Sequence, residues 1–391
     1  GDHIGAKDTS LGGDDCIAVA IILAILADDS LVHPPIEAVF TVDEEVGMDG
    51  AAGLDMSLLK GRRMLNLDSE AEGVFTVSCA GGLRTDCAVP ANMYKLDDIF
   101  NTSEYTCFEL SLEGLIGGHS GVEIDKGRGN AIKLMSRFLY RAACGLKGGF
   151  ALVSLEGGRF DNVICGQCSA IVAVLTEEAG YFENAAGEFA GIIGSEFEAT
   201  DPGAILKCSS YSQKPVNGFS KSDSMRFVRA LFLVPQGVIA MSHDIVGLVQ
   251  TSSNVGIVKT GKNGLKFSCS VRSSLASQKL AVRDRIEAAV VSQGGSVSVR
   301  GDYPGWAYRK DSAVRDVLSR VYEEQTGKKP KITAIHAGLE CGLFSSALEG
   351  LDCVSIGPEL TGIHSVEERL GIASVGRLYR LVTAFLADGQ L

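Results

Sequence analysis

Residues 36–47 read IEAVFTVDEEVG, and this stretch decides how the surrounding sequence is interpreted. Its mostly apolar first part, residues 36–42, predicts a β-strand. Asp43, Glu44 and Glu45 follow at the point where that strand would end. A buried carboxylate is costly unless it is paired or binds a cation. The stretch therefore predicts a strand that delivers acidic groups to one edge of a sheet.

The segments on either side of this stretch predict an α/β layer. Strands that are almost continuously apolar and alternate with helices are typical of a parallel sheet. The predicted fold class is α/β, with a mostly parallel sheet and helices on both faces. The expected helices are 15–28, 48–59, 313–326 and 374–386, and the expected strands are 36–42, 63–67, 331–335 and 353–356.

The middle of the chain has a different pattern. Residues 105–112 alternate between apolar and polar, which is typical of a half-exposed antiparallel strand. A strand–helix–strand order at 105–155 returns at 255–300 and indicates an internal duplication, while the Gly- and Ser-rich stretch 179–224 predicts a loop or an extra hairpin. We therefore expect one discontinuous domain, 1–80 and 305–391, and an inserted α+β domain, 81–304, with an antiparallel sheet.

The composition excludes several classes of protein. The chain has 391 residues, a formal net charge of −12 and a sequence pI of about 5.1. An acidic chain is a poor partner for nucleic acid, whose phosphates need a basic surface, but it is compatible with cation binding. The longest apolar run, 16–27, is shorter than the roughly 18–20 residues that span a bilayer, so we expect a buried helix and no membrane partner.

The cysteines indicate a reducing compartment. There are eleven of them, scattered through apolar stretches rather than arranged as a short disulfide framework, so we expect reduced thiols in a cytoplasm. Cys165 and Cys168 form a Cys-x-x-Cys pair with no second pair at zinc-ribbon spacing, and we interpret them as small residues of a strand at 162–173. The opening Gly1-Asp2-His3 is not a signal peptide, and we expect that the sequence begins inside a longer protein.

Several predicted strand and helix ends carry groups that can bind a metal ion. Asp14 precedes a helix, Glu44 and Glu45 follow one strand, Asp68 follows another, and His364 lies in a loop after a third. In open α/β sheets the functional site lies beyond the carboxyl ends of the strands. Carboxylates that converge there would repel one another without a cation, and one or two zinc-like ions fit such ligands.

Each of these residues also has a structural interpretation. Asp14 could cap its helix and interact with the helix dipole. Glu44 and Glu45 could be solvated loop charges, Asp68 could cap a turn, and His364 could be an ordinary loop histidine. The combination favours a metal site, because all five lie at predicted ends of elements in one sheet.

A set of motifs then resembles one known family. They appear in family order across nearly the whole chain, and the sequence is similar to the aminoacyl-histidine dipeptidases, the carnosinase-like branch of the two-zinc aminopeptidase and carboxypeptidase superfamily. The motifs are TSLGGDD (9–15), FTVDEEVGM (40–48), LNLDSE (65–70), GGHSG (117–121), VRSS (271–274), HAGLECG (336–342), SIGP (355–358) and TGIHS (361–365).

The resemblance implies a two-metal site. Asp14 matches the aspartate that bridges both ions, Glu45 and His364 match ligands of one ion, and Asp68 matches a ligand of the other. The implied cofactors are two divalent ions, zinc first, with cobalt or manganese as alternatives. The resemblance also implies that residues 1–80 and 305–391 form the catalytic domain, and that 81–304 form a lid and dimerisation domain of a homodimer.

The resemblance assigns further roles in catalysis and substrate binding. Glu44 matches the general base, which takes a proton from the attacking water and passes it to the leaving amine. His119 matches a lid histidine that stabilises the oxyanion, in cis or across a dimer. Arg272 matches the residue that binds the substrate carboxylate. Asn162 and Gly357 match positions that contact substrate.

Two features depart from the family pattern. The family has an upstream His-x-Asp motif whose histidine completes the second metal position, and no such motif occurs in this sequence. We therefore expect that the first part of the catalytic domain is absent and that the chain as given is impaired. Asp15 also stands where the family usually has asparagine, and its extra charge would alter metal affinity.

The sequence thus predicts a cytoplasmic metallodipeptidase that cleaves Xaa-His dipeptides. A tripeptidase and an N-acyl amino acid deacylase of the same superfamily are alternative enzymes. A binding or dimerisation protein that has lost catalysis is an alternative from another class. Retention of Glu44, Glu45, Asp68 and His364 argues against that last reading.

Overall fold

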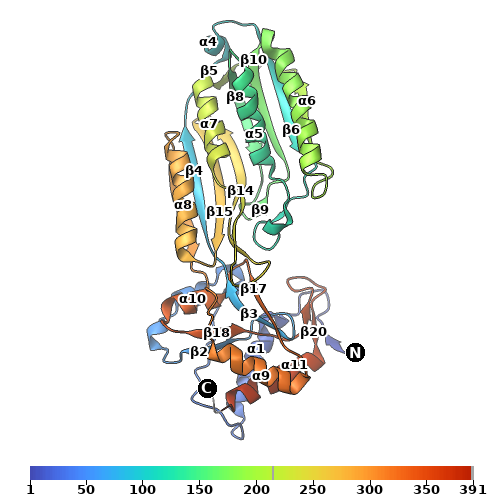
Figure 1. Ribbon diagram of the computed structural model, residues 1–391, viewed down its shortest axis with the longest axis vertical. Helices are drawn as coiled ribbons and strands as arrows, with labels where there is room; N and C mark the ends of the chain where they lie inside the picture. The colour runs from blue at the N-terminus through green and yellow to red at the C-terminus, as the bar shows by residue number, and fades with distance from the viewer. Residues whose placement is uncertain (214, 389–391) are drawn as a thin grey trace. The chain divides into compact units, whose positions relative to one another are not determined.

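The computed structural model describes residues 1–213 and 215–388, which divide into two compact units. Unit 1 consists of Gly1–Gly81, His243–Leu248 and Tyr303–Leu391, and unit 2 of Gly82–Ser242 and Val249–Asp302. Both marked ends of the chain belong to unit 1 (Figure 1). The segment 243–248, which the sequence analysis placed in the insertion, belongs to unit 1, where Asp244 pairs with Lys310 at 3.0 Å. Residues 389–391 of the expected discontinuous domain lie outside the described residues.

Unit 1 combines short strands with helices of up to four turns. Its elements are β1 (His3–Ile4), α1 (Gly13–Ala27), α2 (Glu44–Gly47), α3 (Asp49–Gly53), the 3₁₀ turn η1 (Met56–Leu58), β2 (Arg63–Asn66), β3 (Val74–Cys79), α9 (Ala313–Thr326), β17 (Lys331–Ile335), α10 (Glu340–Ala347), β18 (Asp352–Ser355), β19 (Leu360–Thr361), β20 (Arg369–Gly371) and α11 (Ile372–Leu386).

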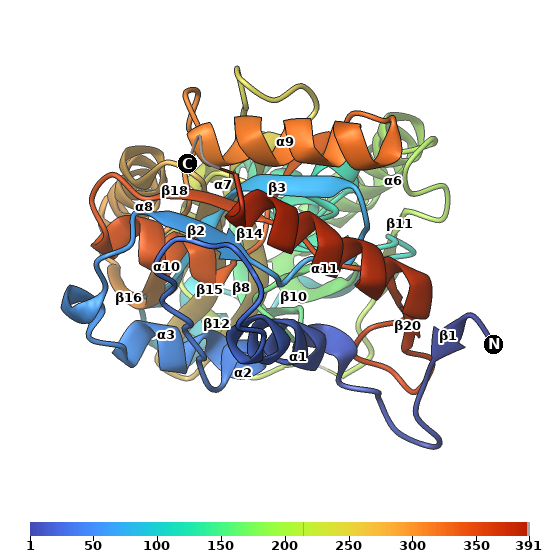
Figure 2. The ribbon, with the colours of Figure 1, turned by 90° about the horizontal axis from the view of Figure 1, so that it is seen from below.

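The described part of unit 1 contains a four-stranded sheet in the order β17-β3-β18-β2. Two of its pairs, β17 with β3 and β18 with β2, are parallel, and β18 meets β3 antiparallel at one residue pair. Neighbouring residues Cys353 and Val354 of β18 are buried in two different apolar clusters, because successive strand side chains point to opposite faces. Helices α9 and α10 lie on opposite sides of these strands (Figure 2). The predicted fold class is confirmed.

Local sequence signals explain how helix α9 is attached to this sheet. The Ser312 hydroxyl accepts the Arg315 N–H at 3.0 Å and so caps the helix, which ends at Gly327 in a left-handed conformation. The same hydroxyl donates to Asp352 at 2.6 Å, at the start of β18. The capping residue therefore also fixes the helix against a strand.

Two expectations about the N-terminal region were wrong. The predicted strand 36–42 has no regular structure, because none of the described strands pairs with it and a strand needs a neighbour for its backbone hydrogen bonds. Two of its apolar side chains nevertheless contact the core. Ile36 packs against the apolar cluster that contains Val354, and Val39 packs against the cluster that contains Cys353. The single helix predicted at 48–59 is instead a short helix, α3, followed by η1.

Unit 2 is built from longer strands and helices. Its elements are β4 (Gly81–Pro90), β5 (Met93–Lys95), α4 (Leu96–Phe100), β6 (Tyr105–Glu113), β7 (Gly118–His119), η2 (Ile124–Lys126), α5 (Ala131–Gly145), β8 (Phe150–Gly157), β9 (Val163–Ile164), β10 (Cys168–Leu175), η3 (Thr176–Glu178), α6 (Ala179–Glu196), β11 (Ile205–Ser210), β12 (Asn217–Phe219), α7 (Lys221–Leu233), β13 (Gly237–Met241), β14 (Val249–Gly261), β15 (Gly264–Ser273), α8 (Ala276–Val291) and β16 (Ser296–Tyr303).

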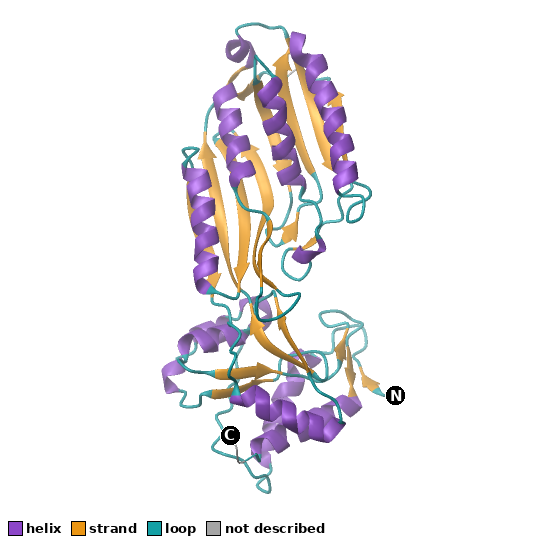
Figure 3. Cartoon of the chain, in the orientation of Figure 1, coloured by secondary structure: helices purple, strands orange, loops and turns teal. Residues whose placement is uncertain are grey.

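The main sheet of unit 2, over the described residues, has nine strands in the order β11-β6-β10-β8-β14-β15-β4-β16, with β13 beside β14. The pairs from β11 through β15 are antiparallel. Helices α5, α6, α7 and α8 lie side by side over one face, and their apolar side chains share one core with the strands (Figure 3). The prediction of an α+β insertion with an antiparallel sheet is confirmed, whereas the internal duplication stays a prediction.

Two details of unit 2 differ from expectation. The stretch 179–224 begins with the 18-residue helix α6 and is not a loop or hairpin, because Phe182, Ala186, Phe189 and Ile193 form an apolar stripe that packs in the core. The predicted strand at 162–173 is interrupted, and Cys165 lies in the loop between β9 and β10.

Candidate metal centre and catalytic residues

Asp14 is held in place by a buried carboxylate from the other end of the sequence. Glu368, only 2% exposed, accepts backbone N–H groups of Gly12 at 2.9 Å, Gly13 at 2.8 Å and Asp14 at 3.3 Å. Burial alone would raise the pKa of Glu368, but these donors lower it overall. No local sequence pattern indicates this role of Glu368, because its partners lie 354–356 positions away in the chain.

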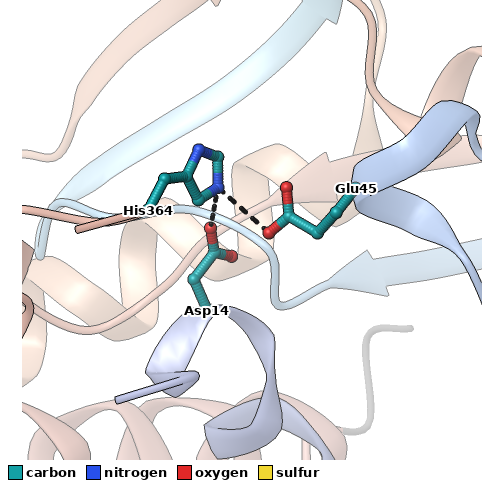
Figure 4. Close-up of side chains that lie close together, drawn as sticks. All are labelled: Asp14, Glu45 and His364. Atoms are coloured by element: carbon teal, nitrogen blue, oxygen red, sulfur yellow. Dashed lines mark hydrogen bonds and ion pairs between the residues drawn. The ribbon is translucent and has the colours of Figure 1, made fainter. Parts of the chain in front are cut away.

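Asp14, Glu45 and His364 form a compact cluster in unit 1 (Figure 4). The His364 Nε2 atom lies 3.2 Å from Asp14 Oδ2 and 3.0 Å from Glu45 Oε1. One ligand atom from each residue lies within 4.8 Å of the others. Two carboxylates and one imidazole are a donor set that suits zinc and related divalent ions. The residues present therefore fit a metal ion.

The backbone at His364 is specialised for this arrangement. His364 has a φ of 59°, in the left-handed region that residues other than glycine rarely adopt. The turn is stabilised locally, since the Ser365 hydroxyl donates to the Gly362 carbonyl at 2.6 Å. A left-handed residue that directs its ring at two carboxylates is typical of a functional site.

Three more carboxylates, Asp15, Asp68 and Glu44, lie near the cluster. Burial, followed by the charge of Asp14, raises the pKa of Asp15 to about 8. Burial, followed by the charge of Asp15, raises the pKa of Asp68 to about 9, and Asp68 also has a hydrogen bond with Asp14. Burial and then the charge of Glu45 raise the pKa of Glu44. No lysine or arginine among the described residues forms an ion pair with them. A bound cation would relieve this repulsion.

A cleft within unit 1 gives access to these groups. It has a volume of about 890 Å³ and is lined by the acidic residues of the cluster together with apolar side chains of α1, β2, α10 and α11. Glu340 also lines it, at the first position of α10. Glu340 belongs to the HAGLECG motif (336–342), which by itself predicts no role for it. A cleft that is mostly apolar, with a few convergent polar groups, is typical of a small-molecule site.

Unit 2 brings together His119, Asn162 and Arg272. His119 lies on β7, which pairs with β9, and the Ser120 N–H donates to the Asn162 carbonyl at 2.9 Å. The N–H groups of Gly121 and Val122 both donate to His119 Nδ1 at 3.2 Å, so the proton of a neutral ring lies on Nε2. Burial, followed by the charge of Arg272, lowers the pKa of His119.

The sequence relationships agree with this chemistry. Residues 11–388 match the model of peptidase family M20/M25/M40. The chain belongs to this family. Cytosol non-specific dipeptidase from Escherichia coli (strain K12) is 36% identical over 388 residues, which is 99% of this chain and 78% of that protein. These findings make the chain a metallopeptidase of the M20 family.

Two solved structures show a similar fold. Aminoacylhistidine dipeptidase from Vibrio alginolyticus has 35% sequence identity and a TM-score of 0.92, over 99% of this chain and 77% of that one. Aminopeptidase PepT from Bacillus cereus has 16% identity and a TM-score of 0.51, over 99% of this chain and 74% of that one, and shows a likeness of fold alone. No helix in the described part of this M20 chain is long and apolar enough to cross a membrane.

Gly357 lies where the backbone of this M20 chain packs closely. Gly357 is buried, and an added Cβ would overlap the Ser69 carbonyl group. Substrate contact through Gly357 stays a prediction.

Cys165 and Cys168 are buried, and the Cys165 thiol donates to the Gln167 carbonyl at 3.0 Å. Burial raises the pKa of both thiols, so neither is suited to act as a thiolate at neutral pH.

Proposed function

We propose that this M20 peptidase hydrolyses dipeptides, with Xaa-His dipeptides as its main substrates. The convergence of Asp14, Glu45 and His364, two of which (Asp14 and Glu45) line the cleft, is the observation that carries the proposal. The two relatives with 35–36% identity, a non-specific dipeptidase and an aminoacylhistidine dipeptidase, support dipeptides over tripeptides or N-acyl amino acids.

The proposed cofactor is a pair of divalent ions, zinc first, with cobalt or manganese as alternatives. Asp14, Glu45 and His364 would hold one ion, and Asp14 with Asp68 would hold the other. The hydrogen bond between Asp14 and Asp68 supports a shared role for Asp14. Bound divalent ions lower the pKa of water and polarise a substrate carbonyl. The second position has fewer ligands in this sequence, so we expect weaker binding there and a low rate.

Glu44 is the proposed proton carrier. It adjoins the ligand Glu45, and both belong to α2, so one short helix places the ligand and the base side by side. Burial and the charge of Glu45 raise the pKa of Glu44, which brings it closer to neutral pH. A carboxylate tuned in this direction can accept a proton from the attacking water and return it to the leaving amine.

Unit 2 supplies the proposed substrate-binding groups. The Nε2–H of His119 is suited to donate to an oxyanion, because Nδ1 already accepts two backbone N–H groups. Arg272, 8% exposed, is suited to bind the substrate carboxylate with its bidentate guanidinium. Asn162 of unit 2 is proposed to contact substrate, as is Gly357, which belongs to unit 1. We further propose a homodimer formed through the inserted domain, in which His119 acts in cis or in trans.

A cytoplasmic location completes the proposal. All eleven cysteines are free, as a reducing compartment requires. The Escherichia coli relative carries "cytosol" in its name, which supports the same location.

A substrate panel tests this function. The protein is incubated with zinc, cobalt or manganese and with Ala-His, Ala-Ala, Ala-Ala-His and acetyl-His, with protein in excess so that low rates are measurable. We expect metal-dependent cleavage of the dipeptides, fastest for Ala-His. Cleavage of acetyl-His but not of the dipeptides would indicate a deacylase. Cleavage of the tripeptide but not of the dipeptides would indicate a tripeptidase. No cleavage with any ion would support the binding-protein alternative.

A further inference from the structure

Glu340 is a buried carboxylate with one oxygen unused. The residue is 9% exposed, and its Oε2 atom accepts a hydrogen bond from the Thr41 hydroxyl at 3.0 Å. Its Oε1 atom is buried and has no hydrogen-bond partner among the described residues. A buried carboxylate oxygen without a partner is destabilising, so such a group usually has a ligand.

The position of Glu340 indicates the kind of ligand. Glu340 lines the same unit 1 cleft as Asp14, Glu44 and Asp68, and its charge contributes to the raised pKa of Glu44, after burial and the charge of Glu45. It is not part of the three-residue cluster that fits a metal ion. None of the described lysines or arginines forms an ion pair with it. The unused oxygen therefore favours a cationic group that arrives with the substrate.

We propose that Glu340 binds the free α-ammonium group of the dipeptide substrate. This inference rests on the proposed dipeptidase function. In a dipeptide of α-amino acids the ammonium nitrogen is two bonds from the scissile carbonyl carbon, so a group that binds it must line the same cleft as the general base. Glu340 meets this requirement and offers a buried acceptor, which forms strong hydrogen bonds with a charged donor.

The hydrogen bond with Thr41 links Glu340 to the segment that carries the proposed base, Glu44. Thr41 precedes Glu44 by three residues, so the segment that carries the base also orients Glu340. A substrate with a free ammonium satisfies Oε1, whereas an N-acylated substrate would leave it buried and unpaired. Glu340 is thus the residue that selects dipeptides over N-acyl amino acids.

Two substrates that differ only in the ammonium group test the inference. The value of kcat/KM is measured for Ala-His and for propionyl-His, its des-amino analogue, with the unchanged protein, Glu340→Gln and the exposed control Glu349→Gln. We expect Glu340→Gln to lower kcat/KM for Ala-His by about 10- to 100-fold and to leave propionyl-His unchanged. Thr41→Val, which keeps the charge but removes the orienting hydrogen bond, should give a smaller loss in the same direction.

A binding measurement separates this inference from the proposed function. Ala-His is titrated calorimetrically into metal-loaded Glu44→Gln and Glu44→Gln/Glu340→Gln proteins, in which turnover is suppressed. Weaker binding of Ala-His by the double variant than by Glu44→Gln supports the ammonium site. Equal binding by both proteins, or loss of bound metal in Glu340→Gln, overturns it while the dipeptidase function stands. Absence of binding by Glu44→Gln contradicts the dipeptidase function itself.

Discussion

Replacement of Asp15 by asparagine should flatten the pH dependence of stability of the metal-free protein. In the folded chain burial and the charge of Asp14 raise the pKa of Asp15 to about 8, whereas an unfolded aspartate titrates near 3.9. Between these values the folded state holds a proton that the unfolded state has released. Stability must therefore fall as the pH rises, by about 1.4 kcal/mol per pH unit for each such proton.

The effect of Asp15 between pH 5 and pH 7 is then about 3 kcal/mol. For a unit of this size that corresponds to roughly 5–10 °C in melting temperature. Asp68, whose pKa is raised to about 9, contributes a similar slope that Asp15→Asn leaves in place. The substitution should therefore remove part of the decline and not all of it. Added zinc should suppress the decline in the unchanged protein, because the cation replaces the protons.

Trp306 provides the assay. It is the only tryptophan in the sequence, is 3% exposed and packs in a unit 1 cluster, so its fluorescence reports the unfolding of that unit. Melting is followed in EDTA at pH 5, 6 and 7 for the unchanged protein, Asp15→Asn and the exposed control Asp29→Asn. Equal slopes for the unchanged protein and Asp15→Asn, or a melting temperature that rises with pH in both, would show that Asp15 does not retain its proton in the folded protein.

The other predictions concern the metal, the substrate and the packing. His364→Ala should weaken zinc binding by at least about 100-fold in a competition titration with a metal indicator, whereas the exposed His243→Ala should leave it unchanged. Arg272→Lys should reduce the preference for Ala-His over Ala-His amide by about 10-fold or more, and an unchanged preference would exclude a carboxylate contact. Gly357→Ala should lower the unfolding free energy by about 1–3 kcal/mol, because its Cβ would overlap the backbone of Ser69.

Several helices and strands could be predicted because their signals are local. The helix 313–326 matches α9 at both ends, since a capping serine and a terminal glycine flank an amphipathic run. The strand predicted at 36–42 failed because pairing depends on a distant neighbour that an apolar pattern does not reveal. The helix at 179–196 was missed because its glycines concealed an apolar stripe.

The candidate site shows the same division between local and distant information. Asp14, Glu45 and His364 could be predicted as metal ligands from motifs and from their positions near the ends of predicted helices and strands. The fold brings these three residues together. Glu368 and Glu340 act through contacts with residues that lie about 300 or more positions away in the sequence. Such roles have no local signal, so only the folded chain shows which buried carboxylates are satisfied and which are not.

The proposed mechanism depends on Glu44 as the base of a metal-dependent dipeptidase. The most direct test compares the unchanged protein with Glu44→Gln and Asp43→Asn, where Asp43 is exposed and its left-handed backbone also suits asparagine. Ala-His hydrolysis under single-turnover conditions and bound metal by mass spectrometry are measured on the same samples. We predict a loss of about 10²- to 10⁴-fold for Glu44→Gln with its metal content intact, and little change for Asp43→Asn. Hydrolysis by Glu44→Gln at the unchanged rate would exclude Glu44 as the base.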